Sequence, residues 1–517
     1  MGKKSSPRNK VGLYWTGEPY VDVGIATVLA FCEKDDPTML TEEDFDRVAC
    51  WIIEHYTKDP LKSFLTVAYT NNSWFAQASF NKQEHKRIER GQRHLYAWQK
   101  PALPDQRCVF TGRPAAKVRL SDKLPIGRAA RAQIPLVQGD DAINFYPNGD
   151  PGLPVSGPAL LCLQAFPLGC AKVAGRLLAV HASEPAITLE FAREFLAINR
   201  RNLSLAQEAG ESKMPETRYG IGTLLIDTLM RIHGEAPHLA ESNSKSNSKS
   251  NAESNSKSNS PFTITAYHLT NSGQSPEVAI YHLPLGITTF LRLANTPRYK
   301  TVWQAIVARA WARQPEQSGA QGDADERAAK VEQRNYLYED LLQLPNQASR
   351  FLRVYFLRRP LRLALVRPEE DPRAAYSIRR EFELISWDLT ALFLREVMNM
   401  DKTRIDHIRN LGDRLAHYIE AENDQKFLLE IYTAKSYELL RNALIKAGRR
   451  AITRSGQPLV TFDQFVSIFE EGEELPYRDW KLARDLLLIH VIERLAPRFR
   501  DHTLEIPDEI TEEEGVA

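Results

Sequence analysis

The chain has 517 residues, of which 43% are hydrophobic and 26% are charged, and its formal net charge is +1. This composition is that of an ordinary folded protein, long enough for about three domains, and no apolar run approaches the ~20 residues of a membrane helix. Five scattered cysteines argue against a disulfide framework. Residues 1–10 are basic, but no secretory type of apolar segment follows them, so we expect a cytoplasmic protein.

The small net charge conceals two basic stretches and one acidic one. Residues 82–131 contain 13 Lys and Arg against 4 Asp and Glu, and residues 350–380 contain 9 against 3. Residues 501–517 hold seven acids and neither Lys nor Arg. Basic stretches on a neutral background are typical of polyanion binding, while solvated faces and internal ion pairs are the alternative interpretation.

The N-terminal part of the chain begins with helical signals. The run over residues 21–32 is apolar nearly all round and predicts a buried helix. Thr41, with Asp44 three positions later, predicts a capping box at the start of a helix over residues 42–56. Two regular elements should therefore precede residue 60.

Residues 64–80 instead favour β structure. Residues 64–69 and 74–80 are rich in strand-forming side chains, and the turn residues 70–73 separate them, so we expect a hairpin. Residues 82–99 then predict a charged helix or helical loop.

The following segments alternate between irregular and regular structure. Proline and glycine in residues 101–158 predict irregular connections. A strand is expected over residues 175–181 and a helix over residues 187–200. The Ser, Asn and Lys repeat of residues 242–260 lacks the apolar side chains needed for a core and predicts a flexible insertion. Two further strands should follow at 262–269 and 278–283, and residues 314–328 should form a polar loop.

From residue 374 to about residue 497 the pattern is helical throughout. Apolar residues recur every three or four positions over residues 378–397, 404–421, 425–447, 462–470 and 479–495. Short connections between these helices predict antiparallel packing in a bundle. We therefore expect an α+β protein with a mixed N-terminal body and a C-terminal helical bundle. The predicted parts are 1–240 for the first part of the body, 241–261 for the insertion, 262–373 for the second part of the body, 374–500 for the bundle and 501–517 for an acidic tail.

Three segments resemble the large subunit of the type I-B CRISPR surveillance complex, Cascade, in the lineage of CXXC-CXXC proteins. They are WTGEPYVDVG at residues 15–24, CVFTG at residues 108–112, and the segment from Asn144 to Gly169 that contains GLPVSGPA and LQAFPLG. The resemblance covers the chain from its start to about Leu203.

The resemblance implies a zinc knuckle whose metal ligands have been lost. The family has two CXXC pairs, and the matching positions here are Cys108, Thr111, Ser156 and Ala159. Because one thiolate cannot hold a structural zinc ion, we expect this degenerate knuckle to bind no metal and to be stabilised by packing and hydrogen bonds. Cys162 and Cys170 are candidate substitute ligands, but they lie in an apolar segment and are expected to be core thiols.

The resemblance also implies a function without catalysis. Such a subunit binds the 5′ region of the guide RNA (crRNA), recognises the protospacer-adjacent motif (PAM) beside the double-stranded DNA target and stabilises the R-loop in antiviral defence. The expected partners are the backbone, 5′-handle-binding and small subunits, together with a recruited helicase-nuclease or transposition proteins. No cofactor and no membrane contact are expected.

Candidate contact residues follow from this expectation and from the local charge. Asn71, Asn72 and Ser73, at the tip of the predicted hairpin, are candidates for reading bases, although Asn is also simply a favoured turn residue. Fourteen cations are candidates for contacting the nucleic-acid backbone. They are Lys82, Lys86, Arg87, Arg90, Arg93, Arg107, Arg113, Lys117, Arg119, Arg350, Arg353, Arg358, Arg359 and Arg362.

The C-terminal bundle resembles the small subunit of the same family, which in type I-B systems can be made from an internal start. Met398 and Met400 precede the helix expected near residue 404 and are candidates for that start. They are equally well explained as ordinary residues at the end of a helix.

Two other functional classes compete with this interpretation. A HEPN-like ribonuclease would use an Arg-polar…His motif on a bundle helix, and residues 409–417 contain Arg409, Arg414 and His417. The spacing fits that motif poorly, and Gly412 disfavours the helix. A helical adaptor that binds only proteins is the third possibility. The sequence contains no phosphate-binding loop of the Walker type.

Overall fold

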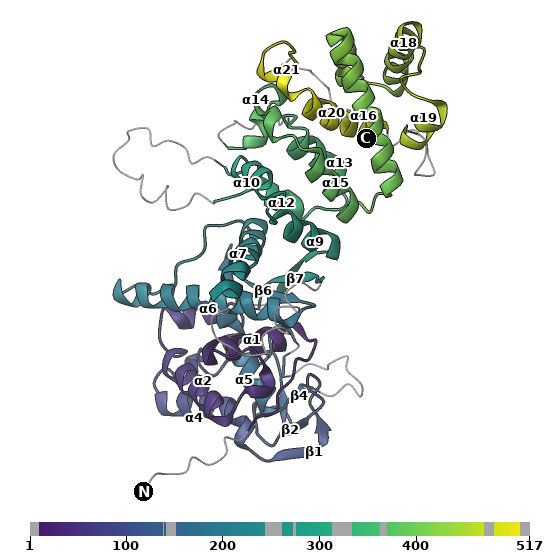
Figure 1. Ribbon diagram of the computed structural model, residues 1–517. Helices are drawn as coiled ribbons and strands as arrows, with labels where there is room; N and C mark the ends of the chain where they lie inside the picture. The colour runs from purple at the N-terminus through teal and green to yellow at the C-terminus, as the bar shows by residue number, and fades with distance from the viewer. Residues whose placement is uncertain are drawn as a thin grey trace, which may run out of the picture. The chain divides into compact units, whose positions relative to one another are not determined.

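The computed structural model describes residues 10–137, 139–140, 151–242, 261–271, 276–312, 333–361, 370–469 and 480–506. The chain forms two compact units, coloured from purple to teal and from teal to yellow in Figure 1. The N-terminal unit comprises residues 1–221 and 235–284, and the C-terminal unit comprises residues 222–234 and 285–517. The fold class is α+β, as predicted, with small antiparallel sheets in the first unit and helices in the second.

The N-terminal unit packs helices against a four-stranded antiparallel sheet. Its helices are α1 (Pro19–Cys32), α2 (Glu42–His55), α3 (Leu61–Leu65), α4 (Glu84–Leu95), α5 (Gly157–Ala165) and α6 (Pro185–Glu208), with 3-10 turns η1 (Pro37–Met39), η2 (Ala78–Phe80), η3 (Ala97–Gln99) and η4 (Phe166–Gly169). The sheet has the order β5 (Ala171–Val173), β6 (Arg176–Ala182), β7 (Ile264–Thr270) and β8 (Glu277–Leu283). Two small sheets pair β1 (Ala102–Arg107) with β2 (Pro114–Ala116) and β3 (Arg128–Ala129) with β4 (Leu153–Pro154).

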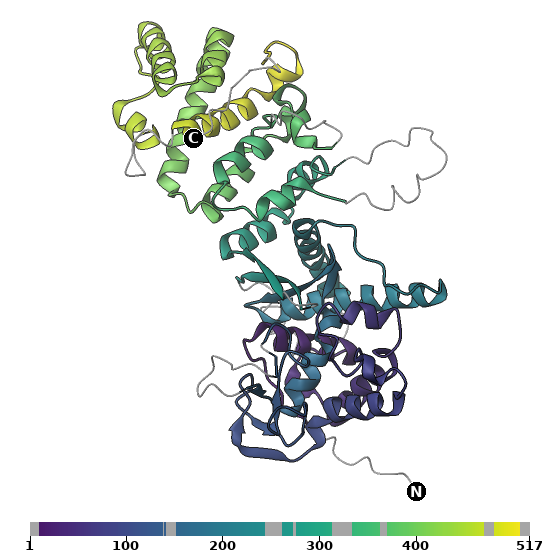
Figure 2. The ribbon, with the colours of Figure 1, turned by 180° about the vertical axis from the view of Figure 1, so that it is seen from behind.

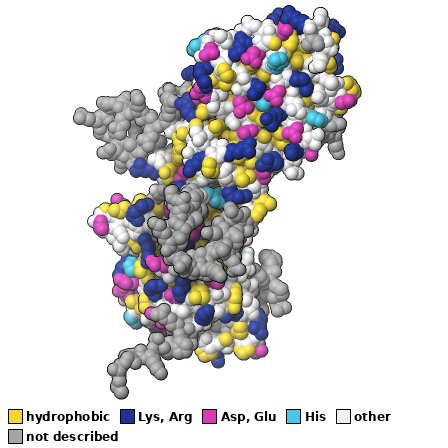
Figure 3. All heavy atoms as spheres, in the orientation of Figure 1, with side chains coloured by type: hydrophobic (Ala, Val, Ile, Leu, Met, Phe, Trp, Pro, Cys, Tyr) yellow, Lys and Arg dark blue, Asp and Glu magenta, His cyan; other side chains and the backbone are white. Residues whose placement is uncertain are grey.

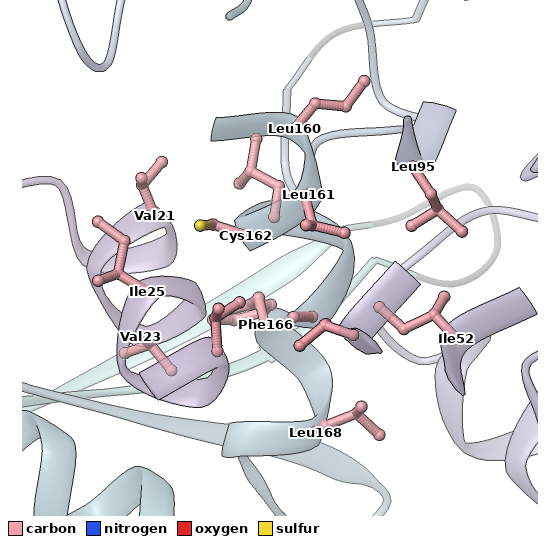
Figure 4. Packing of buried hydrophobic residues seen from close by; sticks show 14 of the residues in the cluster. Val21, Val23, Ile25, Ile52, Leu95, Leu160, Leu161, Cys162, Phe166 and Leu168 are labelled. Carbon is pink, nitrogen blue, oxygen red and sulfur yellow. The ribbon is translucent and has the colours of Figure 1, made fainter. Parts of the chain in front are cut away.

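Helix α1 lies at the centre of this unit because it is apolar on nearly every side. Val21, Val23 and Ile25 are buried, and α1 packs against α5, η4 and α6. Figure 4 shows these side chains on α1, with Cys162 of α5 and Phe166 of η4 beside that helix. Helices α1 and α5 cross closely, since a Cβ on Gly24 would lie 2.2 Å from the carbonyl oxygen of Cys162.

Several predicted elements of this unit are confirmed. Thr41 and Asp44 form the expected capping box at the start of α2. The strands expected after residues 174, 261 and 277 are β6, β7 and β8, and their register pairs Ala179 with Tyr267 and Tyr267 with Ile280.

The predicted hairpin over residues 64–80 is wrong. Residues 61–65 form α3, and turns follow up to η2. Phe64, Tyr69 and Trp74 are buried among the helices of the unit. The apolar and aromatic residues that suggested strands are instead buried between helices. β propensity mainly reflects how a side chain packs, so tertiary contacts can override it.

The C-terminal unit is helical in the residues that the structure describes. Its elements are part of α7 (Ile221–Ser242), then α9 (Leu285–Ala294), α10 (Lys300–Ala308), α12 (Tyr336–Leu341), α13 (Ala348–Phe351), a π-helical turn η6 (Leu352–Phe356), η7 (Pro372–Ala375), α14 (Ile378–Glu381), η8 (Phe382–Leu384), α15 (Trp387–Glu396), α16 (Lys402–Glu422), α17 (Gln425–Thr433), α18 (Tyr437–Ser455), α19 (Phe462–Phe469), α20 (Trp480–Arg494) and α21 (Ala496–Arg500). Figure 2 shows the same helices from behind.

Two of the long helices expected here are interrupted. Residues 378–397 form α14, η8 and α15, and residues 425–447 contain the break between α17 and α18. Ser386 and Ser436 each cap the helix that follows, by accepting hydrogen bonds from Leu389 and Leu439. Serine at these positions satisfies the free N–H groups of a helix start, which explains the breaks.

The boundary between body and bundle lies after residue 284 rather than near residue 374. Residues 285–373 belong to the unit that contains the bundle, because Phe351 and Phe356 of this segment pack on Phe393 of α15. Most of the predicted insertion, the polar loop at 314–328, and tail residues 507–517 lie outside the described residues. In the part of the chain that is described, no helix is long and apolar enough to cross a membrane.

Candidate nucleic-acid interface

The N-terminal signature WTGEPYVDVG builds the start of α1. Asp22 accepts hydrogen bonds from the backbone N–H groups of Thr16 (2.8 Å) and Gly17 (2.9 Å). Glu18 is the N-cap of α1 and accepts a hydrogen bond from the N–H of Val21. These contacts and the close helix crossing at Gly24 give the residues of the signature a role in folding rather than in ligand binding.

The first half of the knuckle is the turn at the tip of the β1–β2 hairpin. The N–H of Cys108 donates to the carbonyl of Arg113 (2.7 Å), and that of Gly112 donates to the carbonyl of Cys108 (2.9 Å). Gly112 has φ +66°, a left-handed conformation that favours glycine. Val109 donates to the carbonyl of Pro154, which ties the turn to β4.

The second half of the knuckle lies at the start of α5 and meets the first. The hydroxyls of Thr111 and Ser156 share a hydrogen bond of 3.0 Å across 45 residues of sequence. Cys108, Ser156 and Ala159 are all buried. The hydroxyl pair thus joins the two segments that the resemblance assigns to one knuckle.

These residues do not fit a structural zinc ion. Such an ion needs four thiolate or imidazole ligands, whereas the knuckle offers the Cys108 thiol, the bonded hydroxyl pair and the methyl group of Ala159. Throughout the described ranges, no group of three or more His, Cys, Asp or Glu side chains could hold a metal ion. Cys162 and Cys170 are buried, and burial raises the pKa of both thiols, so they are core residues.

The three candidate base-reading residues are not equivalent. Asn71 and Asn72 are exposed in a turn. Ser73 is buried, and its hydroxyl donates to the carbonyl of Ala132 at 3.0 Å. Ser73 therefore holds the turn in place and cannot read a base, which corrects the prediction for this residue.

Helix α4 uses some of its predicted cations internally. Arg87, Gly91 and His94 recur along one face and are buried. Arg87 donates to Asn81 at 2.7 Å, and Arg90 donates to Gln77 at 2.9 Å. Arg93 forms an exposed ion pair with Glu89, and Arg113, beside the knuckle, donates to the carbonyl of Val11. These four arginines have structural partners.

Six other cations in this region are exposed and form no ion pair with any described residue. We call them the knuckle-side cations. They are Lys82, Lys86, Lys100, Arg107, Lys117 and Arg119. Sequence reasoning named all of them except Lys100, for which the signal was its place in the basic stretch next to Trp98.

The hairpin and α4 are joined by hydrogen bonds. The N–H of Lys117 donates to the carbonyl of Pro101 at 2.8 Å, so Lys117 lies beside the base of β1, near Lys100. Gln133 donates to the carbonyl of Leu120 and contacts the ring of His94, each at 3.4 Å. Residues 117–120 are thereby attached to α4. Burial lowers the pKa of His94 to about 4, so this connecting ring is neutral.

Three arginines of the second basic stretch are used inside the C-terminal unit. Arg358 is fully buried, pairs with Glu381 at 2.7 Å and lies over the ring of Tyr376. Arg353 bonds Asp485 at 3.0 Å, and Arg359 is buried and donates to the carbonyl of Tyr432.

The prediction for Arg353, Arg358 and Arg359 is therefore wrong, because carboxylates and carbonyls distant in sequence hold them. Arg350 alone of this set is exposed, and Arg362 lies outside the described residues.

The residues suggested for a HEPN-like site also have structural roles. Arg414 donates to the carbonyl of Leu459 and to Gln464, which links α16 to α19. A Cβ on Gly412 would lie 2.6 Å from the ring of His490, so glycine permits the close approach of α16 and α20. His417 is exposed. No observation supports a reaction centre on this helix.

Helix α18 carries a positive surface that sequence reasoning missed. Arg441, Lys446 and Arg449 are exposed and lack an ion-pair partner among the described residues. The signal was present, since residues 439–462 contain no Asp or Glu. On the face shown in Figure 3, however, Lys and Arg side chains of the C-terminal unit are interspersed with Asp and Glu, so that face carries no uniform positive field.

Comparison of this chain with protein-family models, curated proteins and solved structures found no match.

Proposed function

We propose that this chain is the large subunit of a type I CRISPR surveillance complex, in which it binds guide RNA and target DNA without catalysing a reaction. The observation that carries the proposal is the set of knuckle-side cations, which are exposed and have no acidic partner in the part of the chain that the structure describes. The hydroxyl pair of Thr111 and Ser156 supports it, because it joins the two segments that resemble the family's knuckle.

Phosphate groups would supply the anions that these cations lack among the described residues. A Lys or Arg that pairs with an internal carboxylate loses most of its attraction for a polyanion, whereas an unpaired one releases condensed counterions when it meets a phosphate. Lys100 and Lys117 lie at the base of a hairpin that backbone hydrogen bonds hold in place. Binding through these residues would therefore cost little backbone conformational entropy. This surface would position a nucleic acid without reading its sequence.

Sequence readout would fall to other groups. The exposed side-chain amides of Asn71 and Asn72 have the donor and acceptor pair that recognises the edge of adenine. In the proposed complex they contribute to reading the motif beside the target, and base pairing between guide and target reads the rest. Partners in the complex would be the other Cascade subunits.

The test is to co-express the chain with its genomic neighbours, purify the assembly through a tag on this chain, and sequence the bound RNA. We expect guide-length RNA whose 5′ end derives from a CRISPR repeat. An assembly that contains proteins but no such RNA would contradict the proposal and favour a protein-binding adaptor.

Two variants test whether nucleic-acid binding by the complex depends on the knuckle-side cations. Changing Lys82, Lys86, Lys100, Arg107, Lys117 and Arg119 to Gln should reduce target-DNA binding by the purified complex at least tenfold. Changing the paired Arg93 to Gln should have little effect, since its charge is already balanced by Glu89. Equal losses in the two variants would remove the knuckle-side cations from the account.

A further inference from the structure

The C-terminal turns of α18 form a shallow pocket lined with arginine. Arg449, Arg450, Thr453 and Arg454 line a volume of about 240 Å³. Arg450 pairs with Asp424 at 2.8 Å, and Arg454 pairs with Glu422 of α16. Arg449 is exposed and lacks an acidic partner among the described residues. The pocket therefore presents guanidinium donors that suit carboxylates or phosphates.

The outer face of α18 is apolar as well as basic. Leu439, Ile445 and Ile452 are 54%, 43% and 51% exposed, and they alternate along the helix with Lys446 and Arg449. The helix lies at the outer edge of its unit in both views (Figures 1 and 2). Nucleic-acid surfaces combine cations with aromatic rings on which bases stack. Aliphatic side chains between cations instead suit a peptide with both acidic and aliphatic residues.

Such a peptide follows residue 506 of this chain. Residues 507–517 read PDEITEEEGVA and contain Asp508, Glu509, Glu512, Glu513 and Glu514 without any Lys or Arg. Ile510 lies between the two groups of acids, and Val516 follows them. The pattern matches the α18 face in the sign of its charges and in its aliphatic residues.

The described chain ends close to this pocket. The carbonyl of Glu505 accepts a hydrogen bond from the side chain of Gln425 at 2.9 Å. The neighbouring Asp424 is the residue that pairs with Arg450 of the pocket. Seven extended residues span up to roughly 23 Å, so residues 507–513 are long enough to bring the acids to Arg449. At this tether length the local concentration of the acids is on the order of millimolar.

We propose that the acidic segment 508–514 binds the arginine pocket and the aliphatic face of α18. Carboxylates of this segment accept hydrogen bonds from Arg449 and Arg454, and Ile510 packs against Ile452. The site is a peptide-binding surface with an occupant in the same chain, and it is independent of the proposed nucleic-acid contacts of the N-terminal unit.

The test uses the full chain with its five tail acids neutralised, as D508N, E509Q, E512Q, E513Q and E514Q. The probe is a fluorescein-labelled peptide with the sequence of residues 507–517, and its binding is followed by fluorescence anisotropy at low salt. We expect the peptide to bind the neutralised chain at least tenfold more tightly than the wild type, because in the wild type the tail already occupies the pocket.

Two matched charge reversals locate the site. Adding Arg449→Glu to the neutralised chain should weaken peptide binding at least tenfold, while Lys82→Glu, which also reverses an exposed cation without a described ion pair, should leave it unchanged. Because no nucleic acid is present, failure of the proposed function would not alter these results.

Four results would overturn the inference, the last of them from a further control variant. The first is equal peptide binding by the wild-type and neutralised chains, and the second is binding that survives Arg449→Glu. The third is loss of DNA binding on Arg449→Glu without any peptide binding, which would assign the face to nucleic acid. A final control neutralises Glu470, Glu471, Glu473 and Glu474 instead. If that change, and not the tail change, allowed the peptide to bind, the tail would not be the occupant.

Discussion

The knuckle-side cations are exposed and have no acidic partner among the described residues, whereas Arg353, Arg358 and Arg359 of the C-terminal unit are held by carboxylates and carbonyls. Arg358 is fully buried against Glu381, and Arg353 bonds Asp485. Lys100 and Lys117, in contrast, are exposed on a hydrogen-bonded hairpin. A count of basic residues therefore does not distinguish cations that face solvent from cations that the fold pairs internally, and under the proposed function only the first kind would bind a polyanion. If the two regions differ in this way, variants of the paired and the unpaired cations should behave differently.

The largest effect is expected from removing a buried cation. Arg358→Ala leaves Glu381 with one partner fewer in a buried site, so the free energy of unfolding should fall by about 3–5 kcal/mol. Arg350→Ala, in the same stretch but exposed, should change it by less than about 0.5 kcal/mol. Urea titration of the two variants measures both values. Similar values for the two would show that Arg358 is not held as described.

The pH dependence of the free energy of unfolding tests the buried, neutral state of His94, which connects α4 to residues 117–120. Burial lowers the pKa of His94 to about 4, so the unfolded chain binds a proton near pH 6.5 while the folded chain does not. The stabilisation is therefore complete above pH 6.5 and is lost as pH falls toward 4, by up to about 3 kcal/mol. Urea titrations at several pH values should show this slope, and His94→Gln should flatten it. The exposed His85 of the same helix is the control, and a flattening by His85→Gln equal to that by His94→Gln would contradict the assignment.

A smaller effect is expected at the knuckle. Thr111→Ala or Ser156→Ala should each reduce the free energy of unfolding by about 1 kcal/mol, the usual contribution of one hydrogen bond. In the double variant the losses should not add, because both changes remove the same bond. Fully additive losses would mean that the two hydroxyls act separately and that the knuckle is held by packing alone.

Much of the fold could be predicted because its signals are local. The apolar run of α1 and the capping box at Thr41 depend on residues within a turn or two of each other, and both were found. The hairpin at residues 64–80 was wrong because burial by distant helices decided the conformation of Phe64 and Trp74.

The candidate site was predicted less well for the same reason. Asp485, the partner of Arg353, is 132 residues away in sequence, so charge counting could not distinguish this arginine from Arg107. Thr111 and Ser156 were placed together through the resemblance, and their hydrogen bond is the structural observation that joins them.

Salt dependence of DNA binding tests the central claim most directly. The slope of log affinity against log salt should be measured by anisotropy with a labelled mixed-sequence duplex, for wild type and two triple variants. Lys100, Arg107 and Lys117 changed to Gln should reduce the slope by up to about 3, since each phosphate contact contributes about 0.9. Arg350, Arg379 and Arg380, exposed cations of the other basic stretch, changed to Gln should leave it unaltered. The same slope for both variants would contradict the account.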